Sequence, residues 1–198
     1  MAGGRQLQFD KEKALDAAMN VFWNKGFLGA SLAELTSSMG INKPSVYATF
    51  GNKEDLFVEA TRHYLERYAS THVLKLESKE LLKDRLSAYL HSISDMQCQG
   101  PTPNGCYISV AANEMVSESL PEKAVESIAN VGNYAETFLH DFFTSEQRKG
   151  NLAADRHIQE IVMLTVTFLH GLSSLARAGT SKEKIKSIVD SFVKLLDL

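Results

Sequence analysis

Residues 31–57, SLAELTSSMGINKPSVYATFGNKEDLF, carry the start and stop signals of two short helices. Ser31 and Glu34 have the spacing of a capping box, in which each side chain satisfies a free backbone N–H at the start of a helix. Gly40 stands where a left-handed residue ends that helix, and Asn42 can cap the next one. The stretch therefore predicts two helices that meet in a tight turn.

The second of these helices carries an unusual outer face. Val46 and Phe50 have the spacing of one buried helical face, and Pro44 suits the first turn, where a missing N–H costs nothing. A solvated helix of this length would normally carry several Glu and Lys, whereas small, hydroxyl-bearing and basic side chains suit a helix in the major groove of DNA. The outward residues are of this second kind: Lys43, Ser45, Tyr47, Ala48 and Thr49.

The same stretch resembles the TetR family of one-component transcriptional repressors. The shared pattern is a helix that begins at Ser or Thr, a Gly-Ile turn, a Lys-Pro-small segment, Tyr-x-x-Phe and Lys-Glu-x-Leu. In this chain the pattern occupies Ser31, Gly40-Ile41, Lys43 to Ser45, Tyr47 to Phe50 and Lys53 to Leu56, and the preceding helix and turn fit at Ala14, Ala17, Ala18, Phe22, Gly26 and Phe27. Beyond this N-terminal part the family keeps its architecture but not its sequence.

The resemblance implies a set of DNA contacts. Ser31, Tyr47 and Lys53 would contact phosphates, and the outer face of the second helix would meet base edges. Phosphate contacts position a protein on DNA, and base contacts specify the sequence. The implied DNA-binding set is Ser31, Lys43, Pro44, Ser45, Tyr47, Ala48, Thr49 and Lys53. Many relatives have an aromatic residue or His in place of Thr49, so the operator sequence cannot be borrowed from them.

The charge balance agrees with DNA binding near the N-terminus. The chain of 198 residues has a formal net charge of −3 and 44% hydrophobic residues, which is ample for a core. Residues 1–53 hold six basic and four acidic side chains, and the remainder holds 15 and 20. This asymmetry alone is weak support for nucleic-acid binding. Between Glu34 and Glu54, however, the only charges are Lys43 and Lys53.

The sequence indicates a cytoplasmic protein with no membrane association. No apolar segment follows Arg5, so a secretory signal is not expected. The most apolar run, residues 161–169, is far shorter than the ~20 residues needed to span a bilayer. Two cysteines cannot make a disulfide scaffold, and thiols are the default state in a reducing compartment.

Helical periodicity continues along the whole chain, without convincing strand alternation or repeats. We expect an all-α fold of about nine helices, with a three-helix DNA-binding domain in residues 1–52 and an effector-binding and dimerisation domain in residues 53–198. The helices are expected near residues 10–26, 31–39, 42–50, 52–76, 78–99, 106–116, 121–150, 158–178 and 181–196.

The last two helices carry neighbouring apolar stripes. For one stripe, burial in the core would be the simpler account. The resemblance implies instead that both helices pair with their copies in a four-helix dimer interface, and a two-fold dimer matches an operator with two half-sites. The expected interface residues are Phe168, Leu172, Leu175, Ile185, Ile188, Val189 and Phe192.

An effector of unknown chemistry is expected among the fourth to seventh helices. The first residues to test as its pocket are Tyr89, Met96, Cys106, Tyr107, Met115, Tyr134 and Phe138, although an inward apolar residue can equally be core. Cys98 and Cys106 bracket a Gly-Pro loop. Free cysteine often packs as a small hydrophobe, but Cys106 stands at an expected helix start, where the dipole makes thiolate more available for sensing.

Enzyme, cofactor and metal interpretations have little support. Glu59/His63 and Glu136/His140 are spaced by four, whereas a di-iron bundle uses pairs spaced by three. Ordinary pairing on a helix surface is the simpler account, and no phosphate loop, nucleophile elbow or zinc-protease motif is present. The alternative to a regulator is a helical carrier or enzyme that retains a helix-turn-helix, and salt-dependent DNA affinity discriminates between them.

The sequence therefore predicts a dimeric repressor that leaves an inverted-repeat operator when an effector binds. The effector would favour one orientation of the fourth helix and move the two DNA-binding domains of the dimer out of register with the operator. This needs a coupling free energy of only ~1–3 kcal/mol. The effector, the operator sequence, the regulated genes and the direction of control are not written in the sequence.

Overall fold

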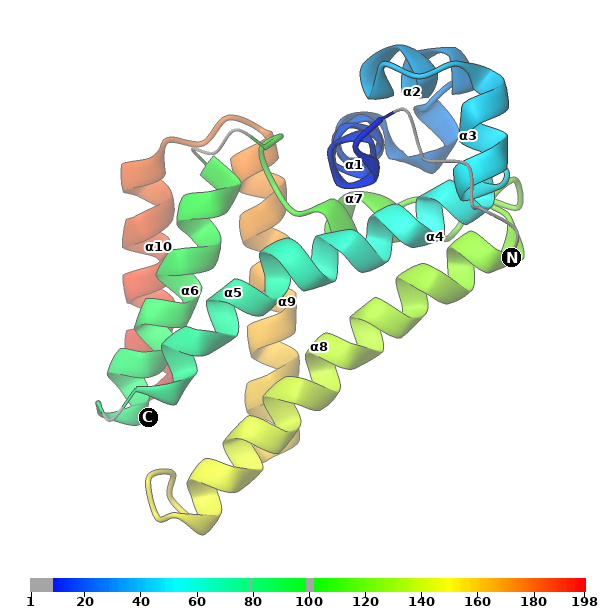
Figure 1. Cartoon of the computed structure of the whole chain (residues 1–198). Coiled ribbons are helices and arrows are strands. Elements are labelled where there is room, and N and C mark those ends of the chain that lie inside the picture. The colour runs from blue at the N-terminus through cyan, green and yellow to red at the C-terminus, as the bar shows by residue number, and fades with distance from the viewer. Residues whose placement is uncertain (1–8, 79, 99–101) are drawn as a thin grey trace.

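The computed structural model describes residues 9–78, 80–98 and 102–198, and every regular element in these ranges is helical. The prediction of an all-α fold is confirmed. In Figure 1, α1, α2 and α3 form one end of the molecule, while α6, α9 and α10 form the other, and α4 and α8 run between the two ends. Residues 99–101, part of the predicted Gly-Pro loop, lie outside the described ranges.

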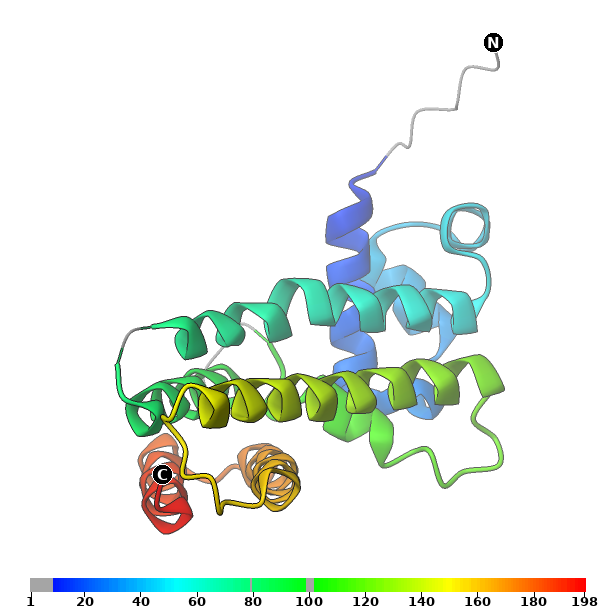
Figure 2. The same ribbon diagram turned by 90° about the horizontal axis from the view of Figure 1, so that it is seen from below.

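The elements follow one another in the predicted order. Figure 2 shows the chain of helices from α4 to α5 lying along α8, with α9 and α10 together beneath. The bounds are α1 Lys11–Gly29, α2 Leu32–Met39, α3 Lys43–Phe50, α4 Lys53–Tyr64, a π-helical turn Leu65–Ala69, α5 Ser70–Val73, a 3-10 turn Leu74–Glu77, α6 Leu82–Cys98, α7 Tyr107–Ala112, α8 Glu122–Arg148, α9 Ile158–Arg177 and α10 Lys182–Leu196.

The caps read from the sequence are present. The Ser31 hydroxyl accepts from the Glu34 N–H at 3.2 Å, and the Glu34 carboxylate accepts from the Ser31 N–H at 3.1 Å. Gly40 ends α2 in the left-handed region with φ 65°, and the Asn42 side chain accepts from the Ser45 N–H at 2.9 Å. Local hydrogen bonding thus fixes the helix-turn-helix.

Four predicted boundaries differ from the structure, and one of them is the start of the fifth expected helix, since α6 begins at Leu82 and not near residue 78. The first helix does not end at Gly26 but kinks there and continues to Gly29. The expected helix over residues 52–76 is one helical path interrupted by a π-helical turn, a feature often found at functional sites. The helix expected over residues 106–116 is shorter in the structure, where α7 ends at Ala112. Beyond its end, the Glu114 carboxylate accepts hydrogen bonds from the backbone of α1.

The first hydrophobic cluster is centred on Trp23, whose side chain is fully buried. Its indole makes edge-on contacts with Tyr64, Tyr68 and Tyr107, with ring centroids 5.2, 5.9 and 6.2 Å away, and such aromatic pairs add to the gain from burial. The cluster draws on α1 to α4, α7 and the start of α8, so it crosses the predicted domain boundary at residue 52.

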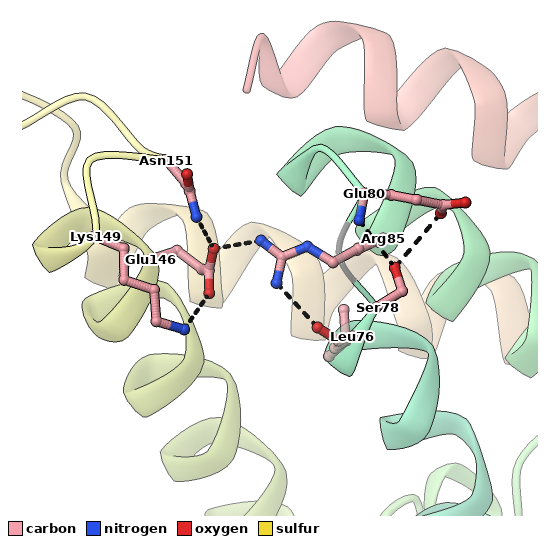
Figure 3. A network of polar contacts seen from close by, with 7 residues as sticks. All are labelled: Leu76, Ser78, Glu80, Arg85, Glu146, Lys149 and Asn151. Carbon is pink, nitrogen blue, oxygen red and sulfur yellow. Dashed lines mark hydrogen bonds and ion pairs between the residues drawn. The ribbon is translucent and has the colours of Figure 1, made fainter.

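A second cluster joins α6, α9, α10 and the C-terminal half of α8. At its edge the buried side chains of Arg85 and Glu146 form an ion pair (Figure 3). Arg85 also donates to the Leu76 carbonyl at 3.0 Å, while Lys149 and Asn151 contact the carboxylate of Glu146 at 3.0 and 2.7 Å. The network ties the start of α6 to the end of α8.

The helix α9 is long and apolar. By length and composition this helix could cross a membrane, with a mean hydropathy of 1.3. The same test is passed by core helices of soluble proteins, and it is weak evidence by itself. In the structure α9 packs against α6, α8 and α10 (Figure 1).

Removal of one partner of the buried pair should strongly destabilise the protein. Burial by itself raises the pKa of Glu146, but hydrogen bonds from Arg85, Asn151 and Lys149 outweigh it and lower the pKa to about 2. Arg85→Met should lower the free energy of unfolding by about 3 kcal/mol, because Glu146 loses its buried cationic partner and keeps only the exposed ammonium of Lys149 and the amide of Asn151. Urea denaturation at neutral pH measures this.

Two controls sharpen the test. Arg148→Met removes an exposed cation of α8, the helix of Glu146, and should change little. Because the Glu146 pKa lies below its ordinary value, the carboxylate's stabilisation is complete at neutral pH and is lost as the pH falls from about 4.5 towards 2. Equal stabilities of Arg85→Met and the parent protein would contradict the role given to this pair.

Candidate functional site

The outer face of α3 has the properties expected of a DNA-reading surface. Val46 and Phe50 are buried in the first hydrophobic cluster, as the helical spacing predicted. No acidic residue occurs on the helix. Lys43, Pro44, Tyr47 and Ala48 are exposed, and Ser45 and Thr49 are half-buried. The surface therefore offers small and hydroxyl groups and a single cation to a partner.

The residues assigned to phosphate contact lie in different settings. Tyr47 is 48% exposed, with the ammonium of Lys43 5.8 Å from its ring centroid. The Ser31 hydroxyl is engaged in the cap of α2. The ammonium of Lys53 lies 4.3 Å from the centroid of the Phe27 ring. Partial burial lowers the pKa of Lys53, and the negative charge of Glu114 opposes this shift. Lys53 therefore stands at the junction of α1 and α4.

A cavity of about 420 Å³ lies on the other side of this junction. Its walls come from α4, the π-helical turn, α5, α6, α7, α8 and α9, and the π-helical turn contributes Leu65, Glu66 and Ala69. This volume lies in the range of small-molecule sites. Five of the seven residues predicted for an effector pocket line it: Tyr89, Met96, Cys106, Tyr134 and Phe138.

The other two predicted pocket residues, Tyr107 and Met115, do not line this cavity. Tyr107 is 1% exposed and points from α7 towards α1 and α4, where its hydroxyl pairs with that of Thr61 at 3.0 Å. Met115 packs against the Trp23 cluster. Tyr107 is therefore a core residue, and Met115 is a half-buried residue at the edge of the same cluster.

The two thiols differ in position. Cys106 lines the cavity, and its sulfur lies 3.3 Å from the Tyr64 hydroxyl. Its backbone N–H donates to the hydroxyl of Ser173 at 2.7 Å, which fixes the start of α7 against α9. Cys98 does not line the cavity. Burial and the charge of Asp95 raise the pKa of its thiol, and the charge of Lys182 partly offsets this rise.

Polar side chains from the C-terminal helices hold the kink of α1. Gly26 has φ 72°, a backbone conformation that favours glycine, and a Cβ there would lie 2.3 Å from a Glu114 oxygen. Glu114 accepts from the N–H groups of Phe27 and Leu28 at 2.6 and 3.1 Å. Arg177 of α9 donates to the carbonyls of Trp23 and Asn24 at 3.1 and 2.5 Å. The free backbone groups on both sides of the kink are thus satisfied from outside α1.

A third polar contact crosses the same junction. Lys123 in the first turn of α8 contacts Asp55 in the first turn of α4 at 2.8 Å. Hydrogen bonding from Lys123 lowers the pKa of Asp55 and raises that of Lys123. The reading helices are therefore joined to the cavity helices through α1 and through α4.

Comparison with known proteins identifies the family. The family model described as "Bacterial regulatory proteins, tetR family" matches residues 14–60. The chain is 30% identical over 187 residues to the HTH-type transcriptional repressor BdcR of Escherichia coli K12, a match that covers 92% of this chain and 86% of BdcR. The chain belongs to the TetR family of transcriptional regulators.

Other relatives agree with this assignment. The HTH-type transcriptional repressor ComR of E. coli K12 is 28% identical over 97% of this chain and 91% of its own. A cysteine mutant of the TetR family regulator CifR, solved with 26 bp double-strand operator DNA, has a TM-score of 0.89 at 31% identity, covering 96% of this chain and 98% of that one. These proteins are described as regulators, in agreement with the expectation that this chain is not an enzyme.

The predicted dimer-interface residues of this TetR-family chain fall into two groups. Leu172, Ile185 and Val189 are at most 1% exposed in the single chain, because they face α6 and α8 in its own core. They have no surface left for a partner, and their assignment to an interface is corrected. Phe168, Leu175, Ile188 and Phe192 keep exposed area, and the rings of Phe168 and Phe192 stack at 3.8 Å.

Several residues of the cavity and of the α1 kink were not predicted from the sequence. His72 and Gln97 line the cavity, and Glu114 and Arg177 hold the kink of α1. The helical pattern of the sequence does not indicate which residues these side chains contact. The expected pairing within Glu59/His63 was also wrong, since Glu59 contacts Lys11 at 3.0 Å and His63 contacts Asp16 at 2.7 Å, both on α1. In the described part of the chain, no group of three His, Cys, Asp or Glu could hold a metal.

Loss of the Glu114 carboxylate should weaken the junction. Glu114→Ala leaves the N–H groups of Phe27 and Leu28 without their acceptor, which should lower the free energy of unfolding by about 1–2 kcal/mol. Glu118→Ala removes an exposed carboxylate of the same connecting segment and should change it by less than about 0.5 kcal/mol. Thermal or urea denaturation compares the two variants, and equal effects would show that the contact with α1 does not matter.

Proposed function

We propose that this TetR-family regulator is a repressor that binds an inverted-repeat operator as a homodimer and is released when a molecule enters the cavity. One observation carries the proposal. The acid-free reading helix and the cavity are joined by α4, which begins beside α3 and whose last residue, Tyr64, lines the cavity. A protein of this kind would act in the cytoplasm, where the DNA is.

Operator binding is supported by a relative and by the surface of α3. CifR, which matches this chain at TM-scores of 0.87 and 0.89, has been solved with 26 bp double-strand operator DNA. Here Lys43, Ser45, Ala48 and Thr49 would meet base edges, and Ser31, Tyr47 and Lys53 would position the backbone of the DNA. The hydroxyl of Ser31 serves the cap of α2, so a second role as a phosphate donor would compete with that cap.

A homodimer is supported by uncovered apolar surface on the last two helices. Met163, Leu164 and Leu195 are 46, 54 and 83% exposed, beside the half-buried pair of Phe168 and Phe192. A soluble protein gains free energy by covering such a surface. A second copy of the chain would cover it symmetrically and would place two reading helices on one operator.

The junction offers a route from cavity to DNA. A molecule that displaces Tyr64 or the π-helical turn would act on α4, and one that displaces α7 would act on Glu114 and the kink of α1. Either movement would change the spacing of the two reading helices. A coupling of ~1–3 kcal/mol is enough to change operator affinity by roughly 5- to 150-fold.

The effector would act reversibly or through a thiol. Cys106 faces the cavity and Cys98 does not, so a thiol-reactive effector would modify Cys106. Mass spectrometry of protein released from the operator separates these routes. A label on Cys106, with release lost in Cys106→Ser, supports the thiol route, and released protein without a label supports reversible binding.

Dimerisation can be tested at α10. Ile188→Asp with Phe192→Asp places two charges on the uncovered face and should give monomers with weak operator affinity, because burial of unpaired charge is costly. Analytical ultracentrifugation measures the assembly. Ser187→Asp with Ser191→Asp, on the exposed side of the same helix, should stay dimeric. An unchanged dimer in the first variant would place the interface elsewhere.

DNA reading can be tested by separating affinity from sequence preference. Lys53→Ala should weaken binding to all sequences similarly and reduce the salt dependence, whereas Lys43→Ala and Thr49→Ala should alter preference at particular base pairs, each worth ~1–3 kcal/mol. Selection of bound fragments from a random DNA library gives the profiles. Unchanged profiles for both α3 variants would reject this placement, and DNA affinity independent of salt would reject the function itself.

A further inference from the structure

The cavity contains hydrogen-bonding groups, but its charged groups lie at the rim. Arg62 and Glu66 are the charged side chains in its described lining besides two histidines. They pair with each other at 3.2 Å, and both are more than 60% exposed. A charged ligand deep in the cavity would therefore find no ionised partner among these residues.

The two histidines do not supply a charge either. Burial, assisted by the charge of Lys75, lowers the pKa of His72 to about 4, and burial lowers the pKa of His170. The ring of His72 contacts the Ser92 hydroxyl at 2.7 Å and the Met96 sulfur at 3.4 Å. His170 contacts the Ser109 hydroxyl at 2.9 Å. His72 is therefore neutral at pH 7, the neutral form of His170 is favoured, and both rings already have polar partners.

Gln97 is different, because its side-chain oxygen has no partner in the described part of the chain. The residue is 2% exposed and lines the cavity, and its Oε1 is buried. Its own carbonyl accepts from the N–H of Gly105 at 3.0 Å, which fixes this end of α6 beside Cys106. A buried acceptor without a donor costs free energy that a ligand donor could recover.

The rest of the wall is mainly apolar. Ile93, Val131, Phe138 and Leu169 line the cavity from α6, α8 and α9. Apolar walls favour apolar ligand surface and oppose the transfer of an ion from water. The cavity thus combines one unpaired acceptor with a mainly apolar wall whose charged groups, Arg62 and Glu66, lie at the rim.

We infer that the cavity binds an uncharged, mainly apolar small molecule that donates a hydrogen bond to Oε1 of Gln97. Alcohols, phenols and amides with an apolar body fit this description, and carboxylates, phosphates and ammonium ions do not. The inference names the effector class for the function proposed above and rests on that function only where it speaks of an effector.

Four probes of similar size separate charge from hydrogen bonding: para-butylphenol, butylbenzene, para-butylbenzoate and para-butylbenzylammonium. Isothermal titration calorimetry on the full chain at pH 7 should give the tightest binding for para-butylphenol. Butylbenzene should bind about tenfold more weakly, and the two ions roughly a hundredfold more weakly or not at all. Binding of either ion as tight as that of the phenol would overturn the inference.

Substitution of Gln97 tests the hydrogen bond. Gln97→Met keeps the side-chain length and removes the acceptor, so it should weaken para-butylphenol about tenfold, or about 1.4 kcal/mol, and leave butylbenzene unchanged. Gln159→Met, on the exposed face of α9, is the matched control. If Gln97→Met does not fold, Gln97→Asn withdraws the amide and should give the same pattern. Unchanged phenol binding in the folded variant would contradict the role of Gln97.

A parallel measurement of operator affinity keeps the two proposals apart. These probes carry no electrophile, so any release of DNA would be reversible and would persist in Cys106→Ser. Probes that bind in the predicted order without changing operator affinity would overturn release by a cavity ligand and leave the ligand class intact. Probes that release DNA without any preference for the neutral donor would overturn the ligand class and support the proposed function.

Discussion

The packing of Trp23 is the contact on which the rest of the structure depends. Its buried indole lies between α1, α4 and α7 and touches the rings of Tyr64 and Tyr107. Tyr64 also lines the cavity and contacts the sulfur of Cys106. One side chain therefore joins α1 of the helix-turn-helix domain to the wall of the cavity.

Polar contacts give this apolar junction a definite geometry. A kinked helix exposes free backbone groups on each side of the break, and buried groups of this kind need partners. Glu114 supplies acceptors on one side of Gly26, and Arg177 supplies donors on the other. Because Glu114 follows α7 and Arg177 lies on α9, the angle of α1 is set from two elements that also contribute to the cavity wall.

The chemistry of the cavity contrasts with that of the DNA-reading face. The face of α3 presents a cation and hydroxyl groups to solvent, whereas the cavity keeps its charges at the rim and leaves the amide oxygen of Gln97 unpaired inside. A regulator of the TetR family needs these two surfaces to respond to different partners. In the proposed function this separation of charge would let an anionic polymer bind one surface and an uncharged molecule the other.

The sequence by itself determined the features that depend on near neighbours in the chain. Interactions within a few residues set all of these features: the cap of α2 at Ser31, the turn at Gly40, the cap of α3 at Asn42 and the inward Val46 and Phe50. Helical periodicity also predicted five of the cavity residues, because inward positions on α6 to α8 face one space. The tertiary structure alone decided which inward residues reach the cavity and which, like Tyr107, Leu172 and Val189, fill the core. It also decided the partners of Glu114 and Arg177, since these contacts join segments far apart in the chain, and a periodic pattern contains no information about which helix lies opposite.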